Sequence, residues 1–176
     1  MSTIKTISKD IFNLLPEGVS GEVKIVKNIK QTFIELFIAG VPWMNNLVAE
    51  DDSHLKLYDQ ANGDVLLVGL GLGCDILLLQ DKPEVTSIEV IENNPEVIAL
   101  VSPFFTNPKV KIIEANIYTW IPTKRYTTIW FDILRDDVDL FPTDKTAMQL
   151  ASNSLVNVGS KVLFWTHPKV ISGDII

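Results

Sequence analysis

The spacing of apolar residues along the first third of the chain predicts a helix, a β-hairpin and a second helix. Residues 7–15 have the spacing of an amphipathic helix, which Pro16 stops. Two runs rich in β-forming residues then flank a short polar break, a pattern typical of an antiparallel hairpin. The elements expected here are a helix over 7–15, hairpin strands over 21–27 and 32–39, a loop over 40–46 and a helix over 49–60.

From Asp64 onward, short and continuously apolar strands alternate with helical segments. Residues 65–68 are apolar at every position, which is typical of a parallel strand covered on both faces. Asn94 and Pro95 have the character of an N-cap and a first helical residue. This alternation predicts a doubly wound, Rossmann-like α/β fold with a mostly parallel sheet and a ligand at the carboxyl ends of its strands. The expected strands are 65–68, 85–91, 110–113, 126–131 and 161–165, and the expected helices are 74–80, 95–103 and 144–155.

The change of pattern also predicts how the chain is divided. A chain of 176 residues can bury a sizeable core without disulfide bonds or metals. We place a boundary near residue 48, so that residues 1–48 form an N-terminal extension of a helix and a β-hairpin. Residues 49–176 then form the Rossmann-like domain that carries the ligand site.

Composition and charge narrow the range of partners. The formal net charge is −7 and the 15 Lys and Arg residues are scattered, so we expect no nucleic-acid partner. One cysteine, Cys74, and two histidines exclude a cysteine-based zinc site and a histidine-rich metal cluster, and we predict no metal site. The alternative is a divalent cation held by the acidic run of Asp132, Asp136, Asp137 and Asp139. His54 falls on the helix before the first parallel strand, and we expect it at the surface. The sequence contains no signal peptide and no stretch suited to span a bilayer, so we expect a cytoplasmic protein without a membrane partner.

A glycine-rich turn supplies the sharpest local signal. Gly69, Gly71 and Gly73 directly follow a strand and precede a helix. Glycines there allow positive φ and close approach of a ligand, and the helix start offers free N–H groups. Glu92 lies 19 residues after Gly73, at the end of the second parallel strand, where an acid hydrogen-bonds the two hydroxyls of a ribose. Together these features predict a ligand that contains adenosine.

Two other interpretations of this turn stay open. Three glycines also form an ordinary tight turn without any ligand. A nicotinamide dinucleotide favours the spacing Gly-x-Gly-x-x-Gly, in which Cys74 stands at the place of the last glycine.

The same segments resemble the class I S-adenosylmethionine-dependent methyltransferase fold, and within it the spermidine synthase-like branch. Residues 65–73 resemble its first motif and residues 85–98 its second strand. Residues 110–120 resemble the third strand with the turn that holds the adenine, where Asn116 matches the usual Asp. The resemblance implies S-adenosylmethionine or decarboxylated S-adenosylmethionine as cofactor. The residues implied to bind it are Gly69, Leu70, Gly71, Gly73, Glu92, Asn93, Asn116 and Ile117.

The chain also departs from that family. Leu67 stands where many methyltransferases carry an acid that contacts the methionine amine. Aminopropyltransferases carry Asp-Ser-Ser-Asp after the fourth strand, whereas this chain has Asp132-Ile-Leu-Arg-Asp136. Because the sequence ends soon after the fifth strand, we expect the last strands of the fold to be lacking.

Methyl transfer depends chiefly on alignment of the reactants, with a base where the acceptor loses a proton. Asp132 ends the segment that resembles the fourth strand, and we predict that it orients the methionine amine or takes that proton. The residues predicted to face the acceptor are Trp43, Asn45, Asp136 and His167.

The function that these features favour is an S-adenosylmethionine-dependent transferase, specifically a methyltransferase with a small-molecule acceptor. The alternatives are a spermidine synthase-like aminopropyltransferase, a non-catalytic S-adenosylmethionine-binding module, and an NAD-dependent oxidoreductase. We also expect the exposed edge of the N-terminal hairpin to offer a surface for a homodimer.

Overall fold

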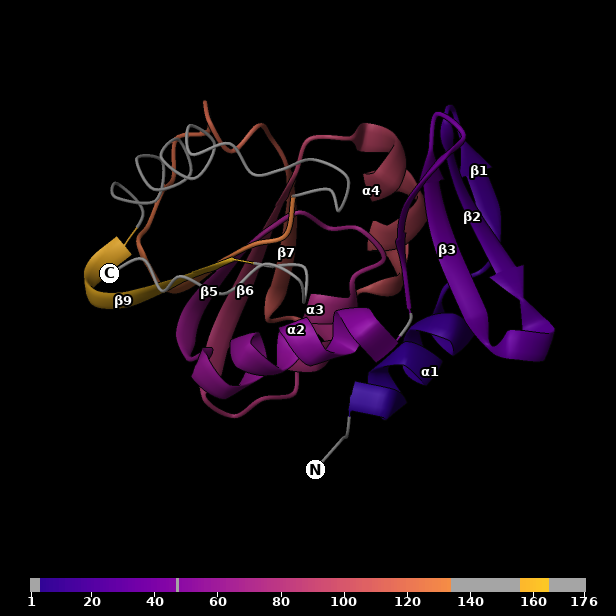
Figure 1. The fold of residues 1–176 in the computed structure, drawn as a ribbon. Helices are drawn as coiled ribbons and strands as arrows, with labels where there is room; N and C mark the ends of the chain where they lie inside the picture. The colour runs from indigo at the N-terminus through magenta and orange to yellow at the C-terminus, as the bar shows by residue number, and fades with distance from the viewer. Residues whose placement is uncertain (1–3, 47, 134–155, 165–176) are drawn as a thin grey trace.

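The computed structural model describes residues 4–46, 48–133 and 156–164, which form two sheets with helices packed against them (Figure 1). The helices are α1 (Ile4–Leu14), α2 (Val48–Gln60), α3 (Cys74–Leu79) and α4 (Pro95–Val101), with short 3₁₀ helices η1 (Ile29–Gln31) and η2 (Ser102–Phe104). The strands are β1 (Gly18–Ser20), β2 (Val23–Asn28), β3 (Phe33–Ile38), β4 (Val41–Asn45), β5 (Gly63–Val68), β6 (Val85–Glu92), β7 (Val110–Glu114), β8 (Tyr126–Phe131) and β9 (Val156–Phe164).

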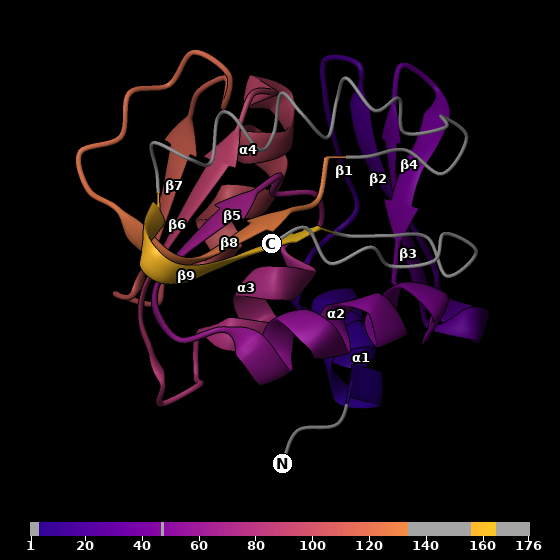
Figure 2. The same ribbon diagram turned by 60° about the vertical axis from the view of Figure 1, so that its left-hand side comes forward.

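The larger sheet is parallel throughout and has the strand order β7-β6-β5-β8-β9 (Figure 2). This arrangement confirms the predicted doubly wound α/β fold. The chain leaves β5 toward β6 on one side and later returns to β8 on the other, so the strand order reverses beside β5. A ligand is expected in the crevice that such a reversal leaves at the carboxyl ends of the strands.

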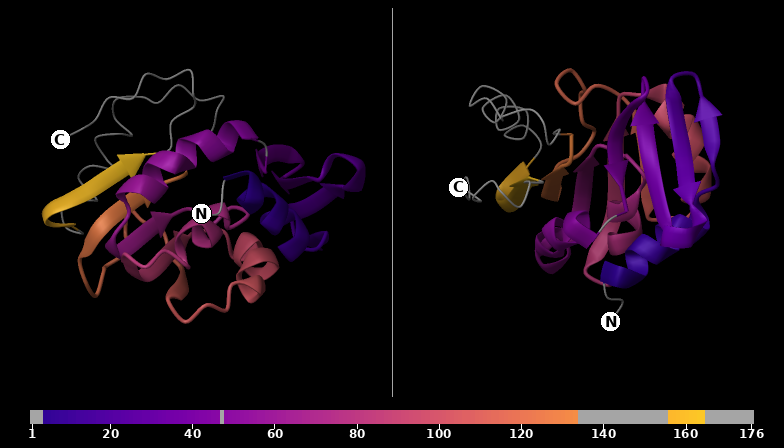
Figure 3. Two further views of the ribbon diagram at one scale, coloured as in Figure 1. Left: turned by 90° about the horizontal axis from the view of Figure 1, so that it is seen from below. Right: turned by 45° about the vertical axis from the view of Figure 1, so that its right-hand side comes forward.

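Both faces of the parallel sheet are buried, which explains the continuously apolar strands. Val65 and Leu67 of β5 pack into the larger hydrophobic cluster, which also holds residues of α1, α2, α3 and α4. Leu66 and Val68 point to the opposite face, where they pack with Phe131 in a second cluster. The helices that the structure describes therefore cover one face of this sheet (Figure 3).

The N-terminal part is a four-stranded antiparallel sheet in the order β1-β2-β3-β4, larger than the expected hairpin. The predicted hairpin is β2 and β3. The loop predicted over 40–46 is wrong, because β4 pairs with β3 there. Ala39 and Gly40 both adopt positive φ in the connecting turn, which suits a tight hairpin turn. Pro42 has no N–H to donate, and β4 tolerates it as an edge strand.

The two extra strands also change the edge that was expected to form a dimer. The outer edge of β2 is paired with β1, and the outer edge of β3 is paired with β4. In the described part of the chain the free edges of this sheet therefore belong to β1 and β4 and not to the hairpin.

The two sheets share one hydrophobic cluster across the boundary expected near residue 48. Ile25 and Leu36 of the N-terminal sheet belong to the same buried cluster as Val65 and Trp130 of the parallel sheet. Asn46 is buried beside this boundary, and its side chain accepts a hydrogen bond from the Ile34 N–H at 2.9 Å. Every helix in the described ranges is too short or too polar to cross a bilayer.

Candidate functional site

A cavity of about 700 Å³ lies at the carboxyl ends of the parallel strands, where the two sheets meet. One wall comes from residues at the ends of β5, β6, β7 and β8, and the facing wall comes from β3 and β4. Small-molecule sites have volumes of roughly 300–1,000 Å³, so this cavity has the size of a ligand site. The parallel fold predicts a ligand at this edge of the sheet, and the N-terminal sheet encloses it.

Glu92 ends β6 and carries its carboxylate into the cavity wall. Its Oε2 accepts a hydrogen bond from the Leu70 N–H at 2.9 Å, and its Oε1 accepts one from the Asn94 N–H at 2.8 Å. The acid and the glycine-rich turn that the sequence paired are thus in direct contact. Each carboxylate oxygen keeps a further lone pair, so Glu92 is held in place and can still accept hydrogen bonds from hydroxyl groups.

Gly69 and Gly71 line the cavity, and both have positive φ, at +103° and +48°. A Cβ at Gly69 would lie 2.4 Å from the backbone oxygen of Asp132, and a Cβ at Gly71 would lie 2.1 Å from Met44 Sδ. The Leu72 N–H donates a hydrogen bond to that sulfur at 3.0 Å. The N-terminal sheet therefore packs directly on the turn. The backbone oxygen of Asp132 leaves room only for glycine at position 69, whereas at position 71 the positive φ favours glycine, since the flexible Met44 side chain can move.

The two other turn residues predicted to bind the cofactor, Leu70 and Gly73, do not line the cavity. Leu70 is 5% exposed and packs in the core, while its backbone N–H reaches Glu92. Gly73 is buried, and a Cβ there would lie 2.3 Å from the ring of Phe105. Neither is among the residues that line the cavity, so their contribution to the site is through the path of the backbone.

The remaining predicted cofactor residues lie on the wall formed by the ends of β6 and β7. Asn93, Asn116 and Ile117 all line the cavity there. The Asn116 side-chain oxygen accepts a hydrogen bond from the Tyr118 N–H at 2.9 Å, which shapes the turn after β7. Tyr118 also lines the cavity and is half exposed, a residue that the sequence analysis did not single out.

Three titratable side chains from separate elements meet at one side of the cavity. His54 of α2, Asp75 of α3 and Asp132, which follows β8, have ligating atoms within 4.8 Å of one another. His54 and Asp132 line the cavity, and Asp75 lies buried behind them. His54 is only 5% exposed, so the expectation of a surface histidine is wrong. The reason is that α2 packs onto the core with this side chain facing inward.

Burial governs the electrostatics of this cluster. Burial raises the pKa of Asp75 to about 7, while the neighbouring indole N–H of Trp130 favours the charged form. His54 Nδ1 lies 3.6 Å from Asp75 Oδ1, and the imidazole contacts the Trp130 ring edge-on. The sequence does hold a signal for Asp75, since it is the one charged residue in the apolar run from 65 to 79.

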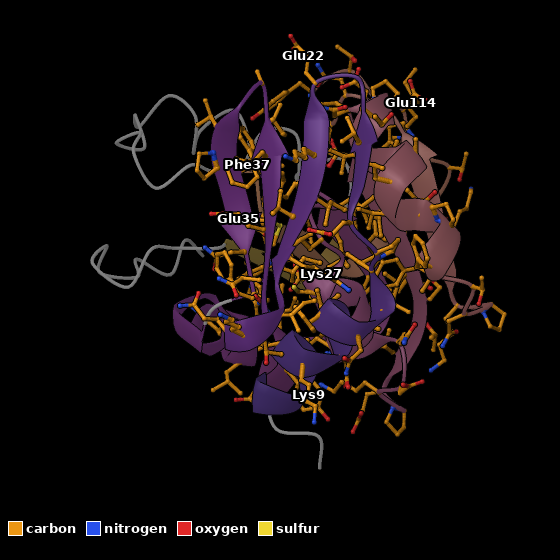
Figure 4. The ribbon with its side chains drawn as sticks, turned by 90° about the vertical axis from the view of Figure 1, so that its right-hand side faces the viewer. Lys9, Glu22, Lys27, Glu35, Phe37 and Glu114 are labelled. Carbon is orange, nitrogen blue, oxygen red and sulfur yellow. The ribbon has the colours of Figure 1, made fainter. Side chains whose placement is uncertain are left out.

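The residues predicted to face the acceptor lie in different places, and only some of them are in the described part of the chain. Trp43 lines the cavity and is 41% exposed. Asn45 pairs directly with Glu35, whereas the neighbouring Met44 pairs with Leu36, which lines the cavity. Since directly paired residues share a face, Asn45 lies with Glu35 on the outer face of the N-terminal sheet (Figure 4). Asp136, His167 and the helix expected over 144–155 lie outside the described residues.

Comparison with known proteins identifies the fold of this chain. No family model and no curated protein sequence matches this chain significantly. Spermidine synthase from Thermotoga maritima matches with 18% identity and a TM-score of 0.57, over 81% of this chain and 53% of its own. CalS10, an amino pentose methyltransferase from Micromonospora echinaspora solved with SAM bound, matches with 16% identity and a TM-score of 0.54, over 72% and 55%. DhpI, solved as a DhpI-SAM-HEP complex, matches with 20% identity and a TM-score of 0.52, over 64% and 51%.

The chain therefore has the class I methyltransferase fold, as its sequence motifs predicted. It spans about half the length of these solved structures. The match to spermidine synthase covers 81% of the chain. This share is larger than the part of the chain that follows the boundary near residue 48, so the match extends into the N-terminal segment.

Proposed function

We propose that the cavity binds S-adenosylmethionine and that the chain is an S-adenosylmethionine-dependent transferase. Two of the matching structures, DhpI and CalS10, were solved with SAM. The fold places its ligand site at the carboxyl ends of the parallel strands, where this chain has its cavity.

The observation that carries this proposal is the anchored carboxylate of Glu92. Two backbone N–H groups, of Leu70 and Asn94, hold it at the end of β6 and beside the glycine-rich turn. Its free lone pairs suit the two neighbouring hydroxyls of a ribose, which explains the position of this acid relative to the turn.

The charge of the cavity favours a cationic ligand. Among the described lining residues, Glu92 and Asp132 are carboxylates and none is Lys or Arg. Negative side chains attract the sulfonium and the ammonium of S-adenosylmethionine, whereas they repel the pyrophosphate of a nicotinamide dinucleotide. The cavity thus favours the sulfonium cofactor over the NAD interpretation.

Each described residue then has a proposed part in binding. Glu92 holds the ribose, and Asn93, Asn116 and Ile117 form the wall beside the adenine. Asp132 follows β8, on the other side of β5 from Glu92, where it can orient the amine of the cofactor or accept a proton from the acceptor. The bound cofactor supplies an activated methyl group, so alignment of a small nucleophile beside Asp132 provides most of the catalysis.

Aminopropyl transfer from decarboxylated S-adenosylmethionine is the second candidate function. The specific observation in its favour is that the match to spermidine synthase extends into the N-terminal segment, whose sheet forms part of the cavity wall. The two candidates differ in whether the cofactor keeps its carboxylate, so their relative affinities distinguish them.

Calorimetric titration with S-adenosylmethionine, its decarboxylated form, S-adenosylhomocysteine and NADH tests the proposal. We expect the sulfonium cofactors to bind and NADH not to bind. Glu92→Gln should weaken binding by about tenfold or more, because hydrogen bonds to a charged group are worth roughly 1.5–3 kcal/mol. Tighter binding of the decarboxylated form would favour aminopropyl transfer over methyl transfer.

Glu114→Gln is the matched control for this substitution. Glu114 pairs directly with Glu92 in the register of β6 and β7, yet it is exposed and is not among the cavity-lining residues. It should leave the affinity unchanged. Equal effects of the two substitutions, or preferential binding of NADH, would contradict the proposed site.

A further inference from the structure

The cluster of His54, Asp75 and Asp132 brings a nitrogen and two carboxylate donors to one place. Each comes from a different element: α2, the first turn of α3, and the residue after β8. Sequence spacing does not join them, since they are 21 and 57 residues apart. Only the packing of α2 and α3 onto the parallel sheet places them together.

One carboxylate oxygen of this cluster is buried and accepts no hydrogen bond from the described residues. The side chain of Asp75 is 8% exposed, and its Oδ1 has no hydrogen-bond partner within the described part of the chain. Leaving a buried carboxylate oxygen without a donor is costly. The same oxygen is the atom that lies 3.6 Å from His54 Nδ1, so it points into the cluster.

We propose that His54, Asp75 and Asp132 bind one divalent transition-metal ion at the side of the cavity. Imidazole with two carboxylates is a donor set that suits Zn²⁺ and Mn²⁺, whereas Mg²⁺ prefers oxygen ligands alone. Ligand atoms about 2.1 Å from a shared metal lie at most about 4.2 Å apart, so a shift of about 1 Å brings the three donors onto one ion.

The surroundings of the cluster have the features of a metal site. The edge-on contact with Trp130, at 6.0 Å between ring centroids, restricts the orientation of the His54 ring. Apolar side chains of the larger core surround Asp75 on α3, which limits access of water. His54 and Asp132 line the cavity, so an ion there is open to ligands from the cavity side. The ion and the amine of the proposed cofactor would therefore compete for the Asp132 carboxylate.

Titration of the chelator-treated full chain with Zn²⁺ and with Mn²⁺ tests this site directly and needs no cofactor. We expect one ion per chain. His54→Gln and Asp75→Asn should each weaken binding at least about tenfold, since even outer-shell changes cost that much at metal sites. Asp59→Asn is the matched control and should leave the affinity unchanged, because Asp59 is an exposed carboxylate on the same helix as His54 and is not among the described residues that line the cavity.

Histidine NMR signals give a second measurement that leaves the site intact. In His167→Gln the one remaining histidine is His54, so its imidazole signals are assigned with all three proposed ligands still present. Stoichiometric Zn²⁺ should shift or broaden these signals. An absence of metal binding, unchanged His54 signals, or equal loss of affinity in the control would overturn the proposal. Because S-adenosylmethionine is absent, these results do not depend on the function proposed above.

Discussion

At the scale of single residues, the surroundings of a residue explain its role better than its amino-acid type does. Gly73 belongs to the glycine-rich turn, yet its φ of +79° and the nearby ring of Phe105 explain why it is glycine. Gly71 faces the cavity and also receives Met44 from the N-terminal sheet. The glycines of the turn therefore allow close packing inside the protein and also form part of the cavity wall.

Asp64 shows how a polar network outside the cavity stabilises the sheet. Its carboxylate accepts a hydrogen bond from the Ser87 hydroxyl, and Lys124 Nζ lies 3.5 Å away. The Ser87 hydrogen bond, together with the charge of Lys124, outweighs partial burial and lowers the pKa of Asp64 from its ordinary value of 3.8. The charged form of Asp64 is therefore favoured in the folded protein.

Asp64→Asn should lower the free energy of unfolding at pH 7 by less than about 1 kcal/mol, because the carboxylate is partly exposed. A carboxyl whose pKa is lowered by folding stabilises the protein above its unfolded pKa, and this contribution is lost as the pH falls through the folded pKa. The difference between wild type and variant should therefore shrink below about pH 4. Urea unfolding at pH 7, 5 and 3.5 measures it, and a difference that grows toward low pH would contradict this account.

At the scale of elements, the start of α4 follows the signals in its sequence. Asn94 is the N-cap, and its side-chain oxygen accepts hydrogen bonds from the N–H groups of Glu96 at 2.9 Å and Val97 at 3.3 Å. Pro95 occupies the first turn, where its missing N–H costs nothing. Because both signals are local, the sequence predicted this helix start correctly.

Asn94→Ala should lower the free energy of unfolding by about 1 kcal/mol, the usual cost of removing an N-cap side chain. Asn94→Asp should keep most of the stability, since Asp also caps helices and its charge suits this end. Chemical denaturation of the three proteins measures both effects. Equal destabilisation by Ala and Asp would show that Asn94 acts through something other than the cap.

β4 shows the limit of local signals at this scale. Its segment contains Pro42 and no alternation of apolar and polar positions, so it resembles a loop. The strand forms because it pairs with β3, and a register shift between Leu36 and Phe37 accommodates it. Pairing with a neighbouring strand determines whether such a segment forms an edge strand, and no pattern within the segment itself predicts that pairing.

At the scale of the whole molecule, the cavity exists because the two sheets pack on each other. The hydrophobic cluster that includes Leu36 of β3 continues into the parallel sheet. The Glu22 N–H also donates a hydrogen bond to the Glu96 carboxylate at 2.8 Å, which ties the N-terminal sheet to α4. The N-terminal sheet is therefore part of the wall of the site and of the core.

We expect the chain to unfold in one cooperative transition in calorimetry, because the core crosses the boundary near residue 48. Leu36→Ala should lower the free energy of that single transition by about 2–5 kcal/mol, the range for a buried leucine. Leu55→Ala on α2 is the matched control, since Leu55 is 43% exposed, and it should cost much less. Two separate transitions, only one of them moved by Leu36→Ala, would contradict a shared core.

The parallel fold and the contact between Glu92 and the glycine-rich turn could be derived from the sequence. Continuous apolar strands, a helix cap and the spacing from turn to acid are local patterns, and parallel topology brings the carboxyl ends of strands together. The cluster of His54, Asp75 and Asp132, the outward position of Asn45 and the pairing of β4 emerged only in three dimensions. These features depend on how elements distant in sequence pack and on the register they adopt, and neither is encoded within a single segment.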